Sequence, residues 1–96
     1  MTAIRAHHYR VDPADLDELI SRRARLIDVV RAKHPGFVSA RLARLEDGSY
    51  SDIWCWESGA QLGAALADIP NIPEAFPAMS LTKDNVVQNG EVIEEL

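Results

Sequence analysis

The sequence lacks several features that define common protein classes. Its 96 residues include a single cysteine, Cys55, which excludes an internal disulfide and a cysteine-rich zinc site. No apolar run approaches membrane-spanning length, and the first residues, MTAIRAHHYRV, lack the apolar core of a signal peptide. We therefore expect a cytoplasmic protein that does not associate with membranes.

Basic residues are also few. Ten lysines and arginines stand against 15 aspartates and glutamates, which gives a net charge of −5. Non-specific binding of nucleic acid needs a basic surface that displaces counterions, so we expect no nucleic-acid partner. Arg22, Arg23 and Arg25 cluster in the first predicted helix, but acids interleave with them. This pattern is typical of a solvated helix face.

No cofactor motif is visible. The five glycines are scattered as turn residues, and there is no phosphate-binding loop, metal-ligand spacing or nucleophile triad. Flavin and nicotinamide motifs are missing too. We expect no cofactor and no metal, so any oxygen chemistry must use electrons from the substrate itself.

Local patterns predict one domain, residues 1–96, built from alternating strands and helices. Asp12-Pro13 and Ser58 with Gln61 are typical helix starts, and Asp47-Gly48 is typical of a hairpin turn. The predicted elements are a strand at 3–11, a helix ending at Pro35-Gly36, a hairpin at 37–56, a helix from 58 to 69, irregular turns at 71–82 and a strand at 84–94. Asn89-Gly90 could break the last strand into a small hairpin.

Neither face of the predicted hairpin is polar. Strict alternation puts Phe37, Ala43 and Leu45 opposite Val38, Ala40 and Leu42 on the first strand. On the second strand it puts Tyr50, Trp54 and Trp56 opposite Ile53 and Cys55. A half-solvated antiparallel sheet would have one polar face, so this sheet needs cover on both sides.

The element order, β-α-β-β-α-β, predicts an α+β, ferredoxin-like fold with a four-stranded antiparallel sheet and both helices on one face. Nothing in the chain remains to cover the other face. An exposed apolar sheet face would exceed what soluble monomers tolerate. We therefore expect a homodimer in which two sheets pair face to face.

The chain resembles the antibiotic biosynthesis monooxygenase domain family of the dimeric α+β barrel superfamily. The residues that carry the likeness are Pro35-Gly36-Phe37, Asp47-Gly48 with Tyr50, and Trp56-Glu57-Ser58. It covers roughly residues 3 to 95. These residues serve turns, packing and capping, so the resemblance is specific for the fold and not for a reaction.

The resemblance implies either cofactor-free oxygenation of phenols and quinols, haem degradation, or no catalysis. Haem-degrading members use an asparagine on the first strand, and a tryptophan and a haem-ligating histidine after the third strand. By alignment these places fall near His7, Ala65 and Ala75. Because the tryptophan and the ligand are missing, the resemblance argues against haem degradation and leaves His7 as a polar group in the pocket.

His7 and His8 are the candidates for proton chemistry, because neutral histidine titrates near working pH. They point to opposite faces of a strand, so at most one reaches a cavity between sheet and helices. The alignment favours His7 as a catalytic base. The alternative interpretation places one histidine at a dimer interface and leaves the other partly exposed.

Trp54 and Trp56 share a face with Asp52 and could stack on a flat aromatic substrate, although tryptophans in central strands are more often core. A buried Asp52 needs a partner, and Arg41 on the preceding strand is a diagonal neighbour. The pair could act in catalysis, or it could stabilise a dimer.

Three more residues complete the predicted site. Tyr9 could orient the oxygen substituents of a substrate, and Phe76 and Met79 follow the second helix, where the family builds a pocket wall.

The leading hypothesis is a cofactor-independent monooxygenase acting on a small aromatic substrate, a phenol, hydroquinone or polyketide-type compound, with O2. The alternatives are a non-catalytic binding or structural homodimer, and a different small-molecule reaction such as isomerisation or cyclisation.

Overall fold

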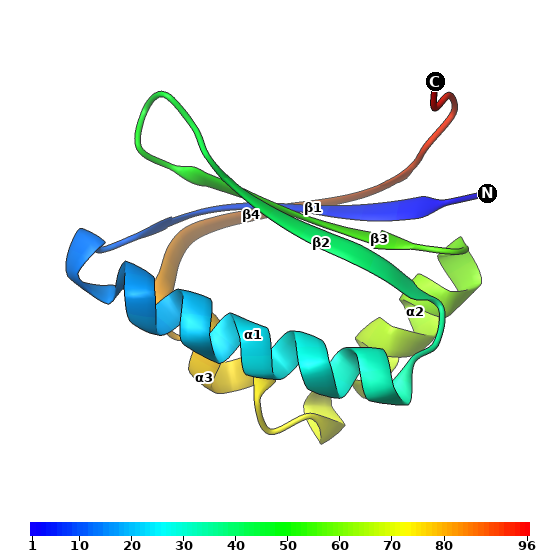
Figure 1. Ribbon diagram of the computed structural model, residues 1–96, viewed down its shortest axis with the longest axis horizontal. Coiled ribbons are helices and arrows are strands. Elements are labelled where there is room, and N and C mark those ends of the chain that lie inside the picture. Colours follow the sequence, from blue (N-terminus) through cyan, green and yellow to red (C-terminus); the bar gives the residue numbers. More distant parts are fainter.

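The computed structural model describes all 96 residues and places every helix on one face of a four-stranded antiparallel sheet (Figure 1). The strand order is β2-β3-β1-β4, which confirms the predicted ferredoxin-like fold. The elements are β1 (Ala3–Val11), α1 (Leu16–Lys33), β2 (Phe37–Arg44), β3 (Tyr50–Trp56), α2 (Gly59–Asp68), α3 (Ala75–Met79) and β4 (Thr82–Glu91). No helix is long and apolar enough to span a membrane.

Both predicted helix starts are confirmed. The Asp12 carboxylate accepts a hydrogen bond from the Ala14 amide at 2.9 Å, although the first turn is a 3-10 turn and α1 itself begins at Leu16. At α2, the Ser58 hydroxyl accepts from the Gln61 amide at 3.2 Å. Each cap satisfies an amide that the helix itself cannot pair.

The prediction for the first hairpin strand was wrong in one respect. The register of β2 against β3 shifts between Phe37 and Ser39, so one extra residue lies in β2. A bulge of this kind reverses the alternation that follows it. Phe37 therefore faces the helices together with Ala40 and Leu42, and Val38 is exposed.

The predicted last strand is confirmed, with bounds of Thr82–Glu91. β4 runs without interruption through Asn89-Gly90 and pairs with β1 as far as Glu91, so no small hairpin forms. A second register shift lies near its start, where Asp84 adopts a φ of 55°. Such a left-handed residue is uncommon outside glycine, and here it accompanies a bulge within β4.

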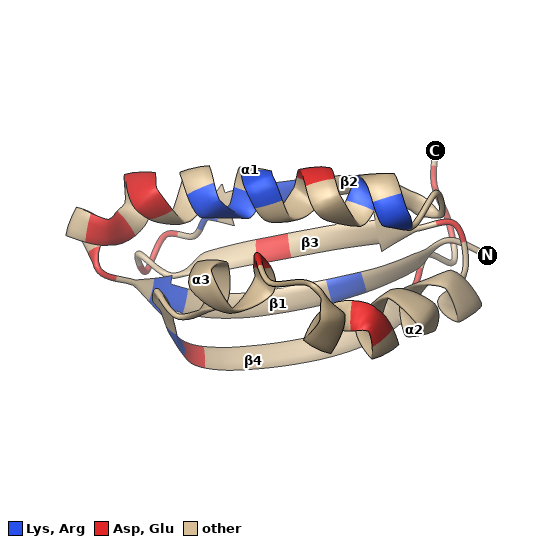
Figure 2. Ribbon diagram, turned by 90° about the horizontal axis from the view of Figure 1, so that it is seen from below, with Lys and Arg blue, Asp and Glu red and all other residues tan.

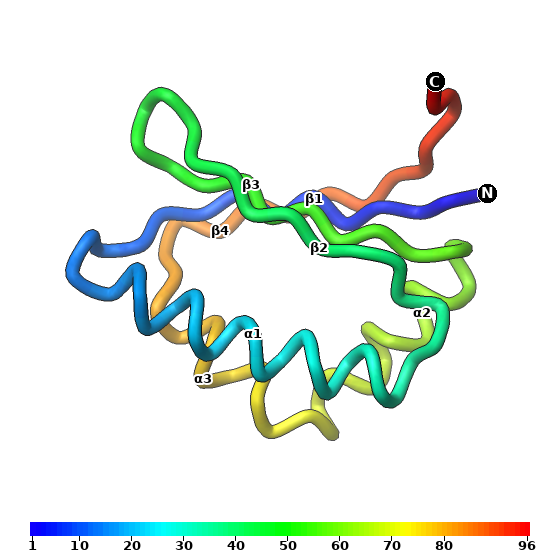
Figure 3. Tube along the Cα trace, in the orientation of Figure 1, coloured from blue at the N-terminus to red at the C-terminus, as the bar shows by residue number.

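The core lies between the sheet and the helices in two groups. The larger group surrounds Trp56, Phe37 and α2; the smaller group surrounds Tyr9, Tyr50 and Leu19. Figure 3 traces how α1 and the α3 segment pass beneath the sheet and shows both termini at the same end of it. Seen from the helix side in Figure 2, charged residues crowd on α1 and are sparse on the strands behind it.

The other face of the sheet carries no helix (Figure 1). Its side chains include apolar groups from each of the inner strands, and Val38 and Val86 are about half exposed, at 52% and 58%. The partly exposed members of this open face are Ile4, Ala6, Ile53 and Cys55. The predicted division into one covered and one uncovered apolar face is thus present.

Gly36 lies where the turn after α1 meets the start of α2. Its carbonyl accepts a hydrogen bond from the Glu57 amide at 2.9 Å. A Cβ at this position would stand 2.5 to 2.8 Å from three side-chain atoms of Gln61. Only glycine allows this approach without moving the cap of α2.

We predict that Gly36→Ala lowers the free energy of unfolding by about 1–3 kcal/mol, since overpacking forces local shifts of that cost. Gly63→Ala is the matched control. Gly63 is exposed in the middle of α2 with nothing within 4 Å of its missing Cβ, so alanine should raise the stability by up to about 1 kcal/mol. Chemical denaturation measures both, and equal effects of the two variants would contradict the close-contact argument.

Candidate functional site

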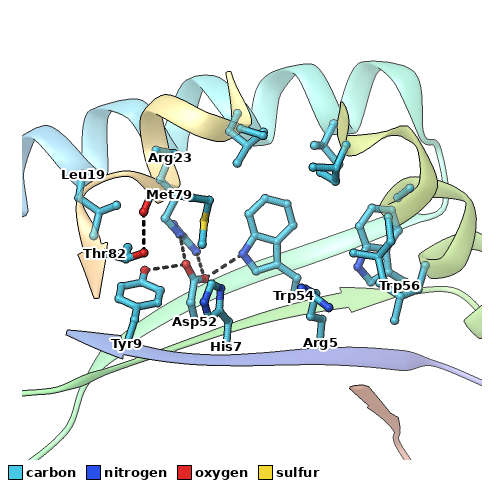
Figure 4. Close-up of a pocket in the computed structure, with 18 residues that line it drawn as sticks. Arg5, His7, Tyr9, Leu19, Arg23, Asp52, Trp54, Trp56, Met79 and Thr82 are labelled. Carbon is cyan, nitrogen blue, oxygen red and sulfur yellow. Dashed lines mark hydrogen bonds and ion pairs between the residues drawn. The ribbon is translucent and has the colours of Figure 1, made fainter. Parts of the chain in front are cut away.

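A cavity of about 160 Å3 lies between the sheet and the helices. Of its 18 lining residues, 13 are hydrophobic. The polar and ionisable ones come mainly from β1 and β3, and Figure 4 shows His7, Tyr9 and Asp52 rising from the sheet while Arg23 reaches down from α1. The five that are not hydrophobic are Arg5, His7, Arg23, Asp52 and Thr82, and Tyr9, counted among the hydrophobic residues, adds a hydroxyl. An apolar cavity with a few convergent polar groups is the usual form of a small-molecule site.

Asp52 is the most completely bonded group in the cavity. It is 6% exposed and pairs bidentately with Arg23 of α1, at 3.0 and 2.9 Å. It also accepts hydrogen bonds from the Tyr9 hydroxyl at 2.8 Å and from Trp54 Nε1 at 2.9 Å (Figure 4). A carboxylate with four charge-assisted or neutral hydrogen bonds has no free lone pair directed at a ligand. Its role is therefore to position its neighbours.

The predicted partnership of Asp52 with Arg41 was wrong. Arg41 pairs with Ile53 across the hairpin, lies on the open face and is exposed, so it does not line the cavity. The predicted solvated face of α1 was also incomplete, because Arg23 turns inward and its side chain is only 14% exposed. The sequence signal was available: Arg23 follows Leu19 by four positions and precedes Leu26 by three, on the buried stripe of the helix.

The Tyr9 hydroxyl is held protonated by this network. Burial, followed by the neighbouring negative charge of Asp52, raises the pKa of Tyr9 far above its ordinary value. Tyr9 is 2% exposed and donates its proton to Asp52. It can therefore shape the cavity wall, but it does not supply a phenolate.

His7 lies opposite Asp52 on the neighbouring strand and makes no bond to it. Its Nε2 lies 2.6 Å from Oδ1 of Asn85 on β4, and the same oxygen accepts from the Thr82 hydroxyl at 3.0 Å. An amide oxygen only accepts, so Nε2 carries the proton of the neutral ring and Nδ1 keeps its lone pair. Burial lowers the pKa of His7, and the nearby positive charge of Arg5 lowers it further, while the bond to Asn85 opposes both. His7 is thus neutral at pH 7, in the state that a base needs.

His8 is exposed on the other face of the sheet and does not reach the cavity. Of the two histidines that the sequence left open, the structure therefore places only His7 in the cavity.

The predicted aromatic and thioether residues divide between cavity and surface. Trp54, Trp56 and Met79 line the cavity. Phe76 does not, because it is 78% exposed on the outer side of the short helix α3. Ala75 and Ala78, three positions apart on one side of α3, take the buried positions.

Sequence reasoning missed two further residues. Arg5 lies on β1, and Asn85 reaches His7 because β1 pairs with β4. The Arg5–Asn89 and His7–Asn85 contacts join residues 84 and 78 positions apart. The alternation of β1 had placed Arg5 on the face of His7 and Tyr9, which was the available signal for Arg5. No local signal existed for Asn85.

The fold and the site define the class of protein: it is a ferredoxin-like α+β domain whose apolar cavity beneath the sheet contains a neutral histidine. No protein-family model matches the chain, and no curated protein matches it. Solved structures do match it. SnoaB of Streptomyces nogalater, a cofactor-independent oxygenase solved as a variant, is 26% identical with a TM-score of 0.79, over 99% of this chain and 96% of that one.

Two other solved structures show the same fold at lower identity. The monooxygenase ActVA-Orf6 of Streptomyces coelicolor, bound to nanaomycin D, is 20% identical with a TM-score of 0.75, over 98% of this chain and 89% of that one. The heme-degrader MhuD of Mycobacterium tuberculosis, with two hemes bound, is 20% identical with a TM-score of 0.70, over 98% of both chains. The resemblance to antibiotic biosynthesis monooxygenase-type proteins, predicted from the sequence, is thus confirmed.

We predict that the Arg23–Asp52 pair behaves as a coupled unit in stability. Arg23→Met should cost about 3–5 kcal/mol, because it leaves a buried carboxylate without its partner. The double variant Arg23→Met/Asp52→Leu should lose less than the sum of the two single variants. Denaturant unfolding of all four proteins measures the coupling.

The control cycle uses the neighbouring residue of the same helix. Arg22 pairs with Glu18 at 2.8 Å, but the two side chains are 30% and 51% exposed, so their coupling should stay under about 1 kcal/mol. Additive effects at the Arg23–Asp52 pair would contradict its role in joining α1 to the sheet.

Proposed function

We propose that the chain is a cofactor-independent monooxygenase that oxidises a small phenol or hydroquinone with O2. The observation that carries the proposal is a neutral histidine, His7, in an apolar cavity whose other polar groups are bonded mainly to one another. The likeness to SnoaB, a cofactor-independent oxygenase, supports the same reaction type.

The size of the cavity limits the substrate. A cavity of about 150 Å3 in another protein holds benzene, so about 160 Å3 accommodates one aromatic ring without rearrangement. An adjoining hollow near the chain's first residues shares Leu62 and Leu66 with the cavity, and it gives larger ligands room to extend between α2 and β4. Trp54 and Trp56 supply flat walls for stacking.

His7 acts as the base in the proposed mechanism. Its Nδ1 accepts the proton of the phenol, and Asn85 holds the ring through Nε2. The resulting anion is electron-rich and transfers an electron to O2. One oxygen atom then enters the substrate and the other leaves as water, so a phenol and O2 give a quinone and H2O. The substrate supplies every electron, which agrees with the absence of a cofactor motif from the sequence.

A second function is favoured by one observation. Asp52 and Tyr9, two of the polar groups in the cavity, are bonded to each other rather than presented to a ligand. A non-catalytic binding protein would show the same arrangement, with His7 as a ligand contact only.

Oxygen uptake on a panel of hydroquinones and anthrones tests the reaction. We predict that His7→Ala lowers kcat/KM by about 10²–10⁴-fold, the usual contribution of a general base. Because the free base must be neutral and its pKa is lowered, kcat/KM should rise with pH through a value below 6.5 and then level off.

His8→Ala is the matched control, since His8 lies on the opposite face of the same strand. It should leave uptake unchanged. Unchanged uptake in His7→Ala would refute the base assignment. Binding of the phenols without uptake in the wild-type protein would favour the non-catalytic function.

We further propose that the open face of the sheet packs against a second copy of the chain. The support is its apolar character across β1, β3 and β4 with no helix above it, since such a face in water favours association. Arg41 and His8 on this face would then contact the partner rather than the cavity.

Light scattering in dilute solution should give about twice the chain mass of 10.6 kDa. Ile53→Asp, in the middle of the open face, should shift the mass to the monomer because it would bury an unpaired charge. Ile20→Asp is the control: Ile20 is 46% exposed on the outer side of α1 and lies away from the open face. A monomeric wild-type mass would overturn the dimer.

A further inference from the structure

The cavity contains one charge that no acid neutralises. Arg5 and Arg23 are its basic residues and Asp52 is its acid. Arg23 forms an ion pair with Asp52, whereas Arg5 takes part in no ion pair within 4.0 Å. Its one side-chain partner is the neutral amide of Asn89, whose Oδ1 accepts from Nη1 at 3.1 Å. A chain of net charge −5 thus has an uncompensated cation in its cavity.

Partial burial disfavours this cation. Arg5 is only partly exposed, and its pKa is lowered because burial disfavours the charged form. A guanidinium remains charged in proteins, so it does not relieve the cost by losing its proton. Arg5 keeps part of its surface in water, and its one side-chain hydrogen bond is to the exposed Asn89, so no carboxylate of the protein balances its charge.

A second unmet group lies beside Arg5. Trp56 is 3% exposed and lines the cavity, and its Nε1–H is buried with no hydrogen-bond acceptor. Trp54, two residues earlier on the same face of β3, has its Nε1 bonded to Asp52 at 2.9 Å. Buried donors without acceptors are rare and costly, so the Trp56 donor indicates a missing acceptor atom.

The two unmet donors belong to one end of the cavity. In the β1–β3 register Arg5 lies opposite Trp54, and Ala3 lies opposite Trp56. Figure 4 accordingly shows Arg5 between the two tryptophans, on the side away from Tyr9. This end carries the Arg5 cation and the buried, unpaired N–H of Trp56, while the other end carries the satisfied Asp52 network and His7.

We infer that this end of the cavity binds an anionic oxygen group of the ligand, with Arg5 as the cation and Trp56 as an added donor. The inference rests on the proposed function and deepens it by naming the substrate class, a hydroxyaromatic carboxylic acid. Alternate residues of a strand are about 6.6–6.8 Å apart, so Arg5 and His7 are spaced to meet the acid and the hydroxyl at opposite ends of one ring.

The test uses two probes of the same size, 4-hydroxybenzoate and its neutral amide, 4-hydroxybenzamide, titrated into the ¹⁵N-labelled protein and followed by NMR. We expect the wild type to bind the acid about tenfold or more tightly than the amide, since hydrogen bonds to charged groups are the stronger ones. Added salt should weaken binding of the acid alone.

Variants separate the two donors. Arg5→Gln should bring the acid-to-amide ratio to about one, and Arg5→Lys should retain part of the preference. Trp56→Phe should weaken both probes several-fold and keep the ratio, because both carry an acceptor oxygen. Arg25→Gln, an exposed arginine of α1, is the matched control and should change nothing.

Three results would overturn the inference: equal affinity of the wild type for the two probes, no binding of either, or a preserved ratio in Arg5→Gln. If the spectrum of Arg5→Gln shows misfolding, the wild-type ratio, its salt dependence and Arg5→Lys decide the question. Binding of the acid does not require oxidation. An anion site without oxygen uptake would therefore refute the proposed reaction alone, and uptake without acid preference would refute the anion site alone.

Discussion

The buried carboxylate of Asp52 joins the two layers of the molecule. It takes a bidentate bond from Arg23 of α1 and further bonds from Tyr9 of β1 and Trp54 of its own strand. A buried carboxylate is tolerated only with such partners, so the position of α1 over the sheet is tied to this one group. The network also fixes the rotamers of Tyr9 and Trp54, which line the cavity.

The same network limits which groups of the cavity remain for the proposed site. Asp52, Arg23 and Tyr9 use their hydrogen-bonding groups on one another, so these groups are not free to bond a ligand. The groups left with unmet capacity are His7, Arg5 and Trp56, and they lie on one face of two neighbouring strands. A small cavity is rigid when one cluster of polar groups is fully hydrogen-bonded within the protein. It can still bind a ligand when a neighbouring cluster keeps free hydrogen-bonding groups.

Some of this was predictable because it depends on residues near one another in the chain. The caps at Asp12 and Ser58, the turn at Asp47-Gly48 and the face of His7 and Tyr9 follow from local hydrogen bonding and strand alternation. The errors arose where alternation was broken or where partners were distant. The bulge after Phe37 reverses a face, and no residue type in the sequence marks it. Hairpin pairing predicted Arg41 as the partner of Asp52, whereas the actual partner, Arg23, comes from α1.

The sequence by itself determined the order of elements, the ferredoxin-like topology and the existence of two apolar sheet faces, since periodicity and turn chemistry act over a few residues. Only the tertiary structure decided which charges meet. A salt bridge depends on distances of a few ångströms between side chains, and here the pairs come from α1 with β3 and from β1 with β4. The pairing of Arg23 with Asp52, and the absence of any such partner for Arg5, are consequences of packing. These two features distinguish the hydrogen-bonded Arg23–Asp52 network from Arg5, which the proposal assigns to ligand binding.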